Sequence, residues 1–147
     1  MNLNGSRRRL GLRCRYTDHV RLALSLWALA WAFVAIPWRS FRPGPSLERV
    51  ELIPFLDGSP RTQVLNVLVF VPLGIIGMRL GWSPRTVALV GAGTSALTEL
   101  LQLFSTRRHP SVTDLILNTT GTLIGIALAI AWSNVRAIDA PERHVRS

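Results

Sequence analysis

The sequence predicts an all-α, polytopic membrane protein with four transmembrane helices joined as antiparallel hairpins, and with both termini inside. Hydrophobic residues make up 48% of the chain although its formal net charge is +9, so apolar and charged residues are segregated. Four apolar segments occur, at 22–38, 64–80, 86–104 and 112–132. Each is close to the ~20 residues that a helix needs to cross a hydrocarbon core of ~30 Å. The basic residues lie mainly at the ends of these segments, as orientation signals do.

The first apolar segment, 22–38, follows a basic tail at 1–21 that carries six Arg residues. A cleaved signal peptide is one interpretation, because Ala28-Leu29-Ala30 fits a small-residue cleavage site. The apolar stretch before that site is short, however, and hydrophobicity continues to Trp38. We therefore expect a retained first helix.

The connections between the other segments predict hairpins. The first connection, about 39–63, contains four Pro residues, so it cannot form one continuous helix. Its apolar stretch 52–55 is expected to lie back against the membrane surface or the helices. The turn before the third segment is short, with Ser83 as the expected N-cap and Pro84 as the first helical residue. The connection 105–111 is equally short.

The distribution of Arg predicts the orientation. With the N-terminus inside, eleven Arg residues lie on the inner side and six on the outer side. Because cytoplasmic loops carry the excess of positive charge, the termini are expected in the cytoplasm. Residues 134–147 are then a cytoplasmic C-terminal tail, and the protein is expected to be a multi-pass protein of a plasma membrane.

Several classes of function receive little support. The basic N-terminal cluster lacks interleaved aromatic residues apart from Tyr16, so contact with anionic lipid is favoured over nucleic-acid binding. The single Cys14 excludes an intrachain disulfide, and the three His residues have no metal-ligand spacing. No glycine loop for phosphate is found. We therefore expect no metal and no cofactor.

Polar side chains inside the apolar segments form the candidate site. In the predicted topology they all approach the outer face, where ionisable residues are candidates for function because their burial in hydrocarbon is costly. Ser95, Glu99 and Gln102 share one helical face by their i, i+4, i+7 spacing. Asp114 and Asn118 share a face of the last segment. With two Arg residues of the adjoining loop, the candidate pocket consists of Asn66, Glu99, Gln102, Arg107, Arg108, Asp114 and Asn118.

Small residues predict close helix packing beside this pocket. Gly121 and Gly125 continue the stripe of Asp114 and Asn118, and a Gly-x-x-x-Gly spacing lets a neighbouring helix approach closely. Gly74 in the second segment is expected to take part in the same packing.

Three interpretations of the polar cluster stay open. It could simply hold three helices together through hydrogen bonds worth about 0.6 kcal/mol each, as in an assembly partner without a ligand. It could bind an amphipathic molecule whose tail occupies lipid, since guanidinium groups suit carboxylate or phosphate. It could also be an enzyme site, with Glu99 or Asp114 as the acid or base.

The chain resembles the VanZ-like membrane proteins, named after a teicoplanin-resistance protein, over roughly Leu52 to Gly125. The stretches that carry the resemblance are Leu52-Ile53-Pro54-Phe55, Asn66 to Gly74, Ser95 to Phe104, Arg107 or Arg108, and Asp114 to Gly125. Thr98 stands where an Ile is more familiar in the family.

The resemblance implies a small bacterial inner-membrane protein of the cell envelope, linked in its founding member to glycopeptide resistance. It supplies no settled biochemical activity. A non-enzymatic protein is favoured, with membrane lipids as partners and a lipid-like or glycopeptide-type ligand in the pocket. The oligomeric state and the choice between Arg107 and Arg108 are left open by the sequence.

Overall fold

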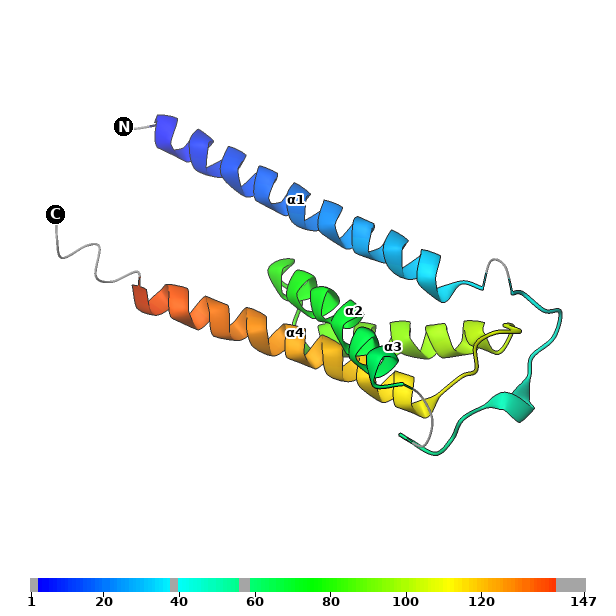
Figure 1. Cartoon of the computed structure of the whole chain (residues 1–147). Helices are drawn as coiled ribbons and strands as arrows, with labels where there is room; N and C mark the ends of the chain where they lie inside the picture. The colour runs from blue at the N-terminus through cyan, green and yellow to red at the C-terminus, as the bar shows by residue number, and fades with distance from the viewer. Residues whose placement is uncertain (1–2, 38–39, 56–58, 140–147) are drawn as a thin grey trace.

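The structure, a computed structural model, describes residues 3–37, 40–55 and 59–139, and contains four α-helices (Figure 1). The first connection, between α1 and α2, is long, and the other two are short. The elements are α1 (Leu3–Ala35), the 3-10 helix η1 (Leu47–Arg49), α2 (Pro60–Arg79), α3 (Pro84–Gln102) and α4 (Val112–Asp139). The described part of the chain contains no strand, only two isolated bridges. The all-α prediction is confirmed.

The helix ends follow their capping residues. α3 begins as expected, because Ser83 Oγ accepts a hydrogen bond from the Thr86 N–H at 3.1 Å and Pro84 is its first residue. The same device begins α2 at Pro60, four residues before the expected start, with Ser59 as its cap. This Ser-Pro pair was overlooked because Arg61 to Gln63 are polar.

Other bounds also differ from the expected ones. α1 ends at Ala35 because the residue before Pro37 is disfavoured in the helical conformation, and Trp38 lies outside the described residues. α1 also includes residues 3–21 of the expected tail, and α4 continues past 132 to Asp139. Hydropathy locates the apolar part of a helix, but a helix can continue into water where no residue stops it.

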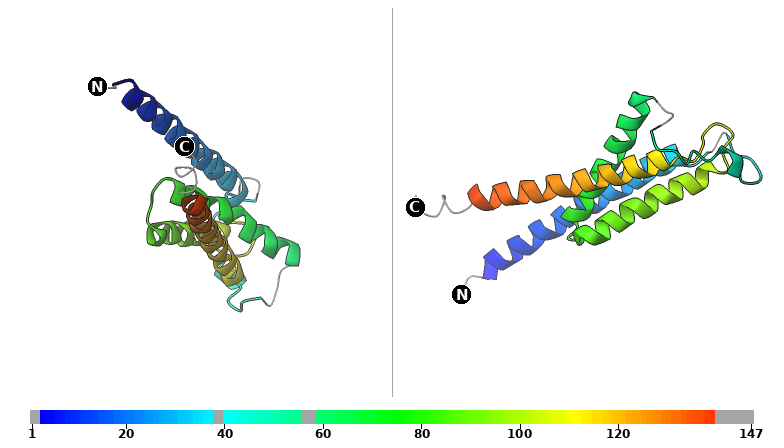
Figure 2. Two further views of the ribbon diagram at one scale, coloured as in Figure 1. Left: turned by 90° about the vertical axis from the view of Figure 1, so that its left-hand side faces the viewer. Right: turned by 90° about the horizontal axis from the view of Figure 1, so that it is seen from below.

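The four helices all have one end at the same end of the molecule. α1 and α3 finish there, while α2 and α4 start there, so consecutive helices alternate in direction (Figure 1). Figure 2 shows that α2 crosses the other helices obliquely, and that its first turn diverges from them. We call this the connection end, because residues 40–55 and the α3–α4 connection both lie at it.

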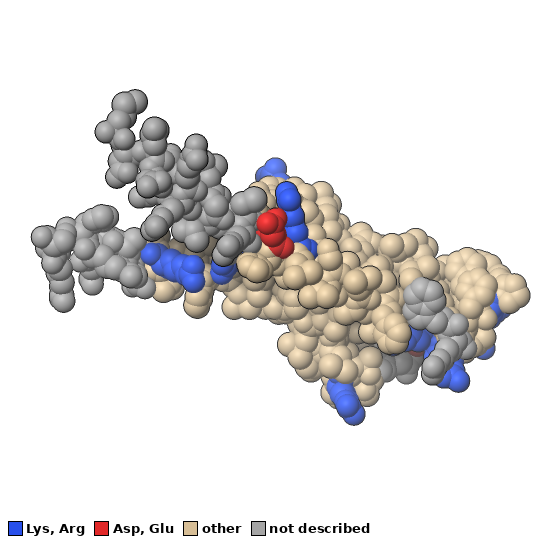
Figure 3. All heavy atoms as spheres, turned by 90° about the horizontal axis from the view of Figure 1, so that it is seen from above, with Lys and Arg blue, Asp and Glu red and all other residues tan. Residues whose placement is uncertain are grey.

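Three helices in the described part of the chain are long and apolar enough to cross a membrane. They contain the spans Thr17–Ala35, Pro60–Arg79 and Val112–Ile138. α3 falls short in composition because one of its faces carries small and polar side chains. On the face in Figure 3, charged side chains lie toward the ends and margins, and other residues form the surface between them. By length and composition, three helices of the described part are membrane-capable, and the expected fourth span, α3, stays a prediction.

Glycine residues bring the backbones of α2 and α4 into contact. A Cβ atom added at Gly74 would lie 2.3 Å from the Thr122 carbonyl oxygen, and one at Gly125 would lie 2.2 Å from the Val71 carbonyl oxygen. One added at Gly121 would lie 2.2 Å from the Val67 carbonyl oxygen. Only the absence of a side chain permits this approach, which fixes the position of α2 against the polar stripe of α4.

Two tryptophans attach α1 to the other helices. Trp27 Nε1 donates to the Val69 carbonyl oxygen at 2.7 Å, and Trp31 Nε1 donates to Thr98 Oγ1 at 3.1 Å. Trp27 also packs edge-on against Phe70. Between residues 22 and 34, α1 also presents exposed apolar side chains such as Leu29, as expected of a helix that faces lipid.

Residues 40–55 form a strap across the α3–α4 connection. The Arg42 N–H donates to the Phe104 carbonyl oxygen at 2.9 Å, and the Glu51 N–H donates to the Pro110 carbonyl oxygen at 2.9 Å. The Phe55 N–H donates to Thr113 Oγ1 at 2.8 Å. The strap therefore holds the connection, and with it Arg107 and Arg108, in a defined place.

Candidate functional site

A cavity of about 650 Å³ lies near the connection end, with walls from all four α-helices. It is lined by the seven residues of the predicted pocket: Asn66, Glu99, Gln102, Arg107, Arg108, Asp114 and Asn118. Asn66 belongs to α2, Glu99 and Gln102 belong to α3, and Asp114 and Asn118 belong to α4. Because α2 runs obliquely, its first part diverges from α1 and α3 (Figure 2).

The two carboxylate oxygens of Glu99 differ in their hydrogen bonds. Its Oε2 accepts a hydrogen bond from the Ser111 N–H at 2.7 Å, directly before the first residue of α4. A carboxylate is favourable at this place, because the first N–H groups of a helix lack partners and carry partial positive charge. Its buried Oε1 has no hydrogen-bond partner among the described residues. Glu99 thus joins α3 to α4 and keeps one acceptor uncommitted.

Asn118 is also half-satisfied. Its Nδ2 donates to Ser95 Oγ at 3.0 Å across the α3–α4 interface, while its Oδ1 has no partner in the described structure. Only 4% of Asn118 is exposed, and Ser95 is fully buried. Across the cavity, Nδ2 of Asn66 is likewise buried; it lies close to the Asp114 carboxylate but makes no hydrogen bond of ordinary geometry among the described residues. An unpaired buried polar atom costs about 1–3 kcal/mol, so these atoms favour binding of a molecule that supplies partners.

The remaining helix residues complete the polar wall. Gln102 is 4% exposed at the last residue of α3. Asp114 lies in the first turn of α4, near the partial positive charge of the helix start. Gln102 and Asp114 both line the cavity, so the structure brings them together with Glu99 and Asn118.

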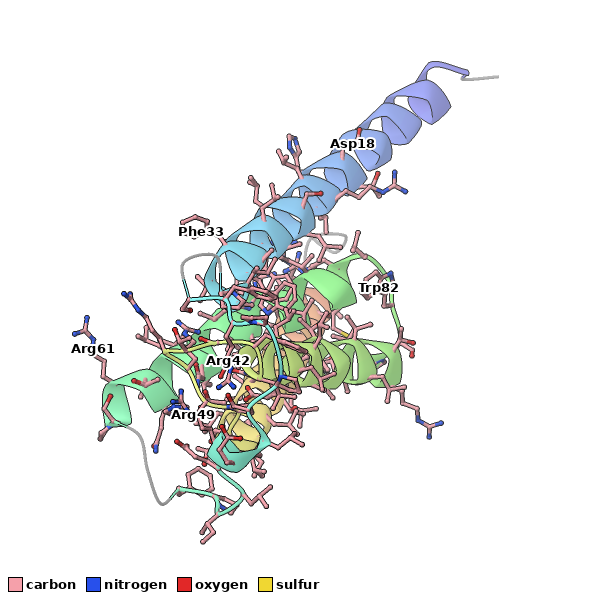
Figure 4. All side chains as sticks on the ribbon, turned by 90° about the vertical axis from the view of Figure 1, so that its right-hand side faces the viewer. Asp18, Phe33, Arg42, Arg49, Arg61 and Trp82 are labelled. Carbon is pink, nitrogen blue, oxygen red and sulfur yellow. The ribbon has the colours of Figure 1, made fainter. Side chains whose placement is uncertain are left out.

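The two arginines are held by their backbone rather than by their side chains. Buried Ser105 Oγ accepts hydrogen bonds from the N–H groups of Arg107 and Arg108, at 3.2 Å and 3.1 Å. Neither guanidinium group forms an ion pair with the carboxylates of the described residues, where the pairs found are Arg42–Glu48 and His109–Glu51. Figure 4 shows that Arg42 and Arg49 come from the strap, and that Arg61 points away from the helices.

Sequence reasoning missed several residues of the cavity. Trp31 and Thr98 form one wall together, and Thr62 and His109 also line it. Trp31 carried a signal: it lies in the middle of its apolar segment, where a membrane-interface tryptophan is not expected. His109 is within 3.9 Å of Glu51 (Nδ1 to Oε1), a pairing across the strap that spacing could not reveal.

The arrangement suits recognition of a ligand with both polar and anionic groups. Unpaired acceptors on Glu99 and Asn118 can bind hydroxyl or ammonium donors, and two guanidinium groups can bind phosphate or carboxylate. Among the described residues no group of three or more His, Cys, Asp or Glu could hold a metal ion.

Comparison with known proteins gives one match. A family model described as VanZ/LLP1 matches residues 20–133, which include all four apolar segments and the whole cavity. No curated protein and no solved structure matches the chain.

Proposed function

We propose that this chain, which belongs to the VanZ/LLP1 family, binds a lipid-like ligand of the cell envelope in the cavity at its connection end. The protein is a membrane protein with three membrane-capable helices. In the proposed topology α3 is a fourth span, both termini are cytoplasmic, and the cavity opens toward the extracytoplasmic side of a bacterial inner membrane. The excess of Arg at the opposite end supports this orientation.

One observation carries the proposal. Three buried polar atoms, Asn66 Nδ2, Glu99 Oε1 and Asn118 Oδ1, make no hydrogen bond of ordinary geometry among the described residues and belong to residues around one cavity. Asn66 Nδ2 lies close to Asp114, so the two acceptors on Glu99 and Asn118 are the strongest part of this observation. If the polar side chains served only to hold the helices together, fewer buried polar atoms would lack a partner, because the side chains would pair with one another. The polar part of a ligand would satisfy them, while its apolar part would stay beside the lipid-facing helices.

Ligand retention tests the proposal. Protein purified from its native envelope is analysed by native mass spectrometry beside Glu99→Gln and Asp114→Asn, with the strap variant Glu48→Gln as a matched control. Glu48 is exposed and does not line the cavity. We expect the first two variants to retain roughly tenfold less lipid-like ligand, the loss that a missing charge-assisted hydrogen bond produces. Equal retention in all four proteins would overturn the proposal.

Two further experiments test a role in glycopeptide resistance and the alternative that the protein is an enzyme. A deletion strain complemented with wild type or Glu99→Gln is scored for teicoplanin susceptibility and envelope lipid profile. We expect wild type alone to restore both. A lipid chemically altered by the purified wild type, and left intact by Asp114→Asn, would instead show an enzyme with the two carboxylates as acid and base.

A further inference from the structure

A second cavity, of about 620 Å³, lies on the other side of Gln102 and shares both arginines with the first. Its wall includes five consecutive apolar residues, 33–37, where α1 ends. Phe33 stands at its mouth and is directed away from the other helices (Figure 4). Thus a cavity that contains the carboxylate and amide groups meets, at a pair of guanidinium groups, a second cavity that has one apolar wall and no carboxylate.

From this juxtaposition we infer that the two cavities form one site for a lipid whose anionic phosphate lies between a hydroxyl-bearing head and its apolar chains. The inference rests on the proposed function of the first cavity and names the chemical order of the ligand. The head lies against Glu99, Asn118 and Asn66, the phosphate binds Arg107 and Arg108, and a chain occupies the second cavity.

The arginines fit the middle position. Their N–H groups are fixed by Ser105 Oγ, so both side chains start from a defined place. Their guanidinium groups make no hydrogen bond within the described residues. A guanidinium group is planar and can bind phosphate through two parallel N–H donors. Two adjacent guanidinium groups can therefore bind opposite sides of one phosphate group.

The polar cavity fits a head that donates hydrogen bonds. Two of its three unpaired atoms, on Glu99 and Asn118, are acceptors. A second anionic group there would face Glu99 and Asp114 and be repelled, whereas hydroxyl groups would donate to the acceptors. Beyond the phosphate we therefore expect a polyol or sugar.

The α1 wall of the second cavity, residues 33–37, fits a hydrocarbon chain, while Ser40, Gln102, Ser105 and the two arginines form its polar side. Burial of methylene groups against Val34, Ile36 and Pro37 is favourable by about 0.8 kcal/mol per group. Ala35 is 3% exposed and belongs to both cavities, so the helix end itself separates the chain from the head.

Phosphatidylglycerol is the probe, because its chains, phosphate and two hydroxyls occur in this order. The delipidated protein is kept in a polyoxyethylene detergent, which lacks sugar hydroxyls, and retention is measured by native mass spectrometry. We expect dipalmitoyl phosphatidylglycerol to be retained roughly tenfold better than phosphatidylethanol, which lacks the hydroxyls, or dipalmitoylglycerol, which lacks the phosphate. Equal retention of the three would overturn the inferred order.

Variants test the second cavity separately from the first. Ile36→Trp should fill it and lower retention of the dipalmitoyl lipid roughly tenfold, while the short-chain dihexanoyl lipid binds as before. Leu29→Trp, on an exposed part of α1 outside both cavities, is the matched control. Phe33→Ala should also lower retention of the dipalmitoyl lipid, but by less. Because Phe33 is exposed, this substitution should not disturb the fold.

The outcomes separate the two proposals. If Ile36→Trp and Leu29→Trp retain the dipalmitoyl lipid equally, the second cavity does not hold its chain and the inference fails. If Glu99→Gln retains the dihexanoyl lipid as wild type does, the proposed polar cavity fails instead. The double variant Arg107→Gln/Arg108→Gln should lose both lipids, and unchanged binding there would exclude the phosphate position.

Discussion

The Ser111 N–H donates to Glu99 Oε2 at 2.7 Å, so the end of α3 is joined through a carboxylate to the start of α4. This bond gives Glu99 a structural role beside its place in the cavity. The two roles use different oxygens, since Oε1 has no partner in the described structure. They can therefore be separated by substitution.

Glu99→Gln should preserve the fold and impair ligand binding. The amide oxygen can still accept from the Ser111 N–H, so we expect the free energy of unfolding to fall by less than about 1 kcal/mol. Glu99→Ala leaves that N–H without its acceptor and should cost about 1–3 kcal/mol. Thermal unfolding in detergent measures both, and equal destabilisation by Gln and Ala would show that charge, not the acceptor, joins the helices.

Gly121→Ala should separate α2 from α4. Its new Cβ would lie 2.2 Å from the Val67 carbonyl oxygen, a backbone atom that cannot rotate away. We expect a loss of about 1–3 kcal/mol, as for other overpacked sites, and weaker ligand retention because Asn66 moves away from Asn118.

Gly93→Ala is the matched control for this change, since an added Cβ at Gly93 has no atom within 4 Å. It should leave the unfolding temperature unchanged or slightly raised, because alanine favours helix. A Gly121→Ala protein as stable as Gly93→Ala would contradict the backbone contact between α2 and α4.

Ser95→Ala tests how far the buried amide network supports the site. The substitution removes the oxygen that accepts from Asn118 Nδ2, at 3.0 Å, and leaves a second unpaired atom on that amide. We expect a modest destabilisation of about 0.6 kcal/mol, typical of hydrogen bonds between membrane helices. Thr94→Ala, one residue earlier on the same helix, is the control, and both proteins are compared by thermal unfolding.

The converging faces could be predicted from the sequence because helical period and alternating direction fix them. Glu99 and Gln102 lie seven or fewer residues from Ser95, so one face carries all three, and the connection lengths place α4 opposite. The hydrogen bond from Ser111 could not be predicted. It depends on the shape of a turn, and many turns would join the same two helices.

Packing partners were also only partly predictable. The spacing of Gly121 and Gly125 indicates a close helix neighbour but does not say which helix it is. Gly91 was missed altogether: it lies against the Thr122 side chain, where an added Cβ would be 2.4 Å from Oγ1. A contact between a glycine on one helix and a threonine on another produces no spacing pattern in the sequence, so it could not be predicted.

The polar face of α3 keeps its mean hydropathy below that of the apolar spans in the other three helices. That face is covered by α4 at Gly91 and Ser95 and by Trp31 of α1 at Thr98; all three α3 residues are buried, so its polar groups do not meet lipid. A helix packed in this way can cross a bilayer that it would not enter alone. We therefore expect α3 to span the membrane.

Cysteine labelling tests this in a Cys14→Ser background, with an impermeant maleimide applied to intact cells. Thr106→Cys, beyond the end of α3, should be labelled, whereas Ser83→Cys, before its start, should react only after the cells are opened. Ser133→Cys on the last part of α4 should behave like Ser83→Cys, because both lie at the Arg-rich end. If Ser83→Cys and Thr106→Cys react alike in intact cells, α3 does not cross, and the cavity cannot lie within one leaflet.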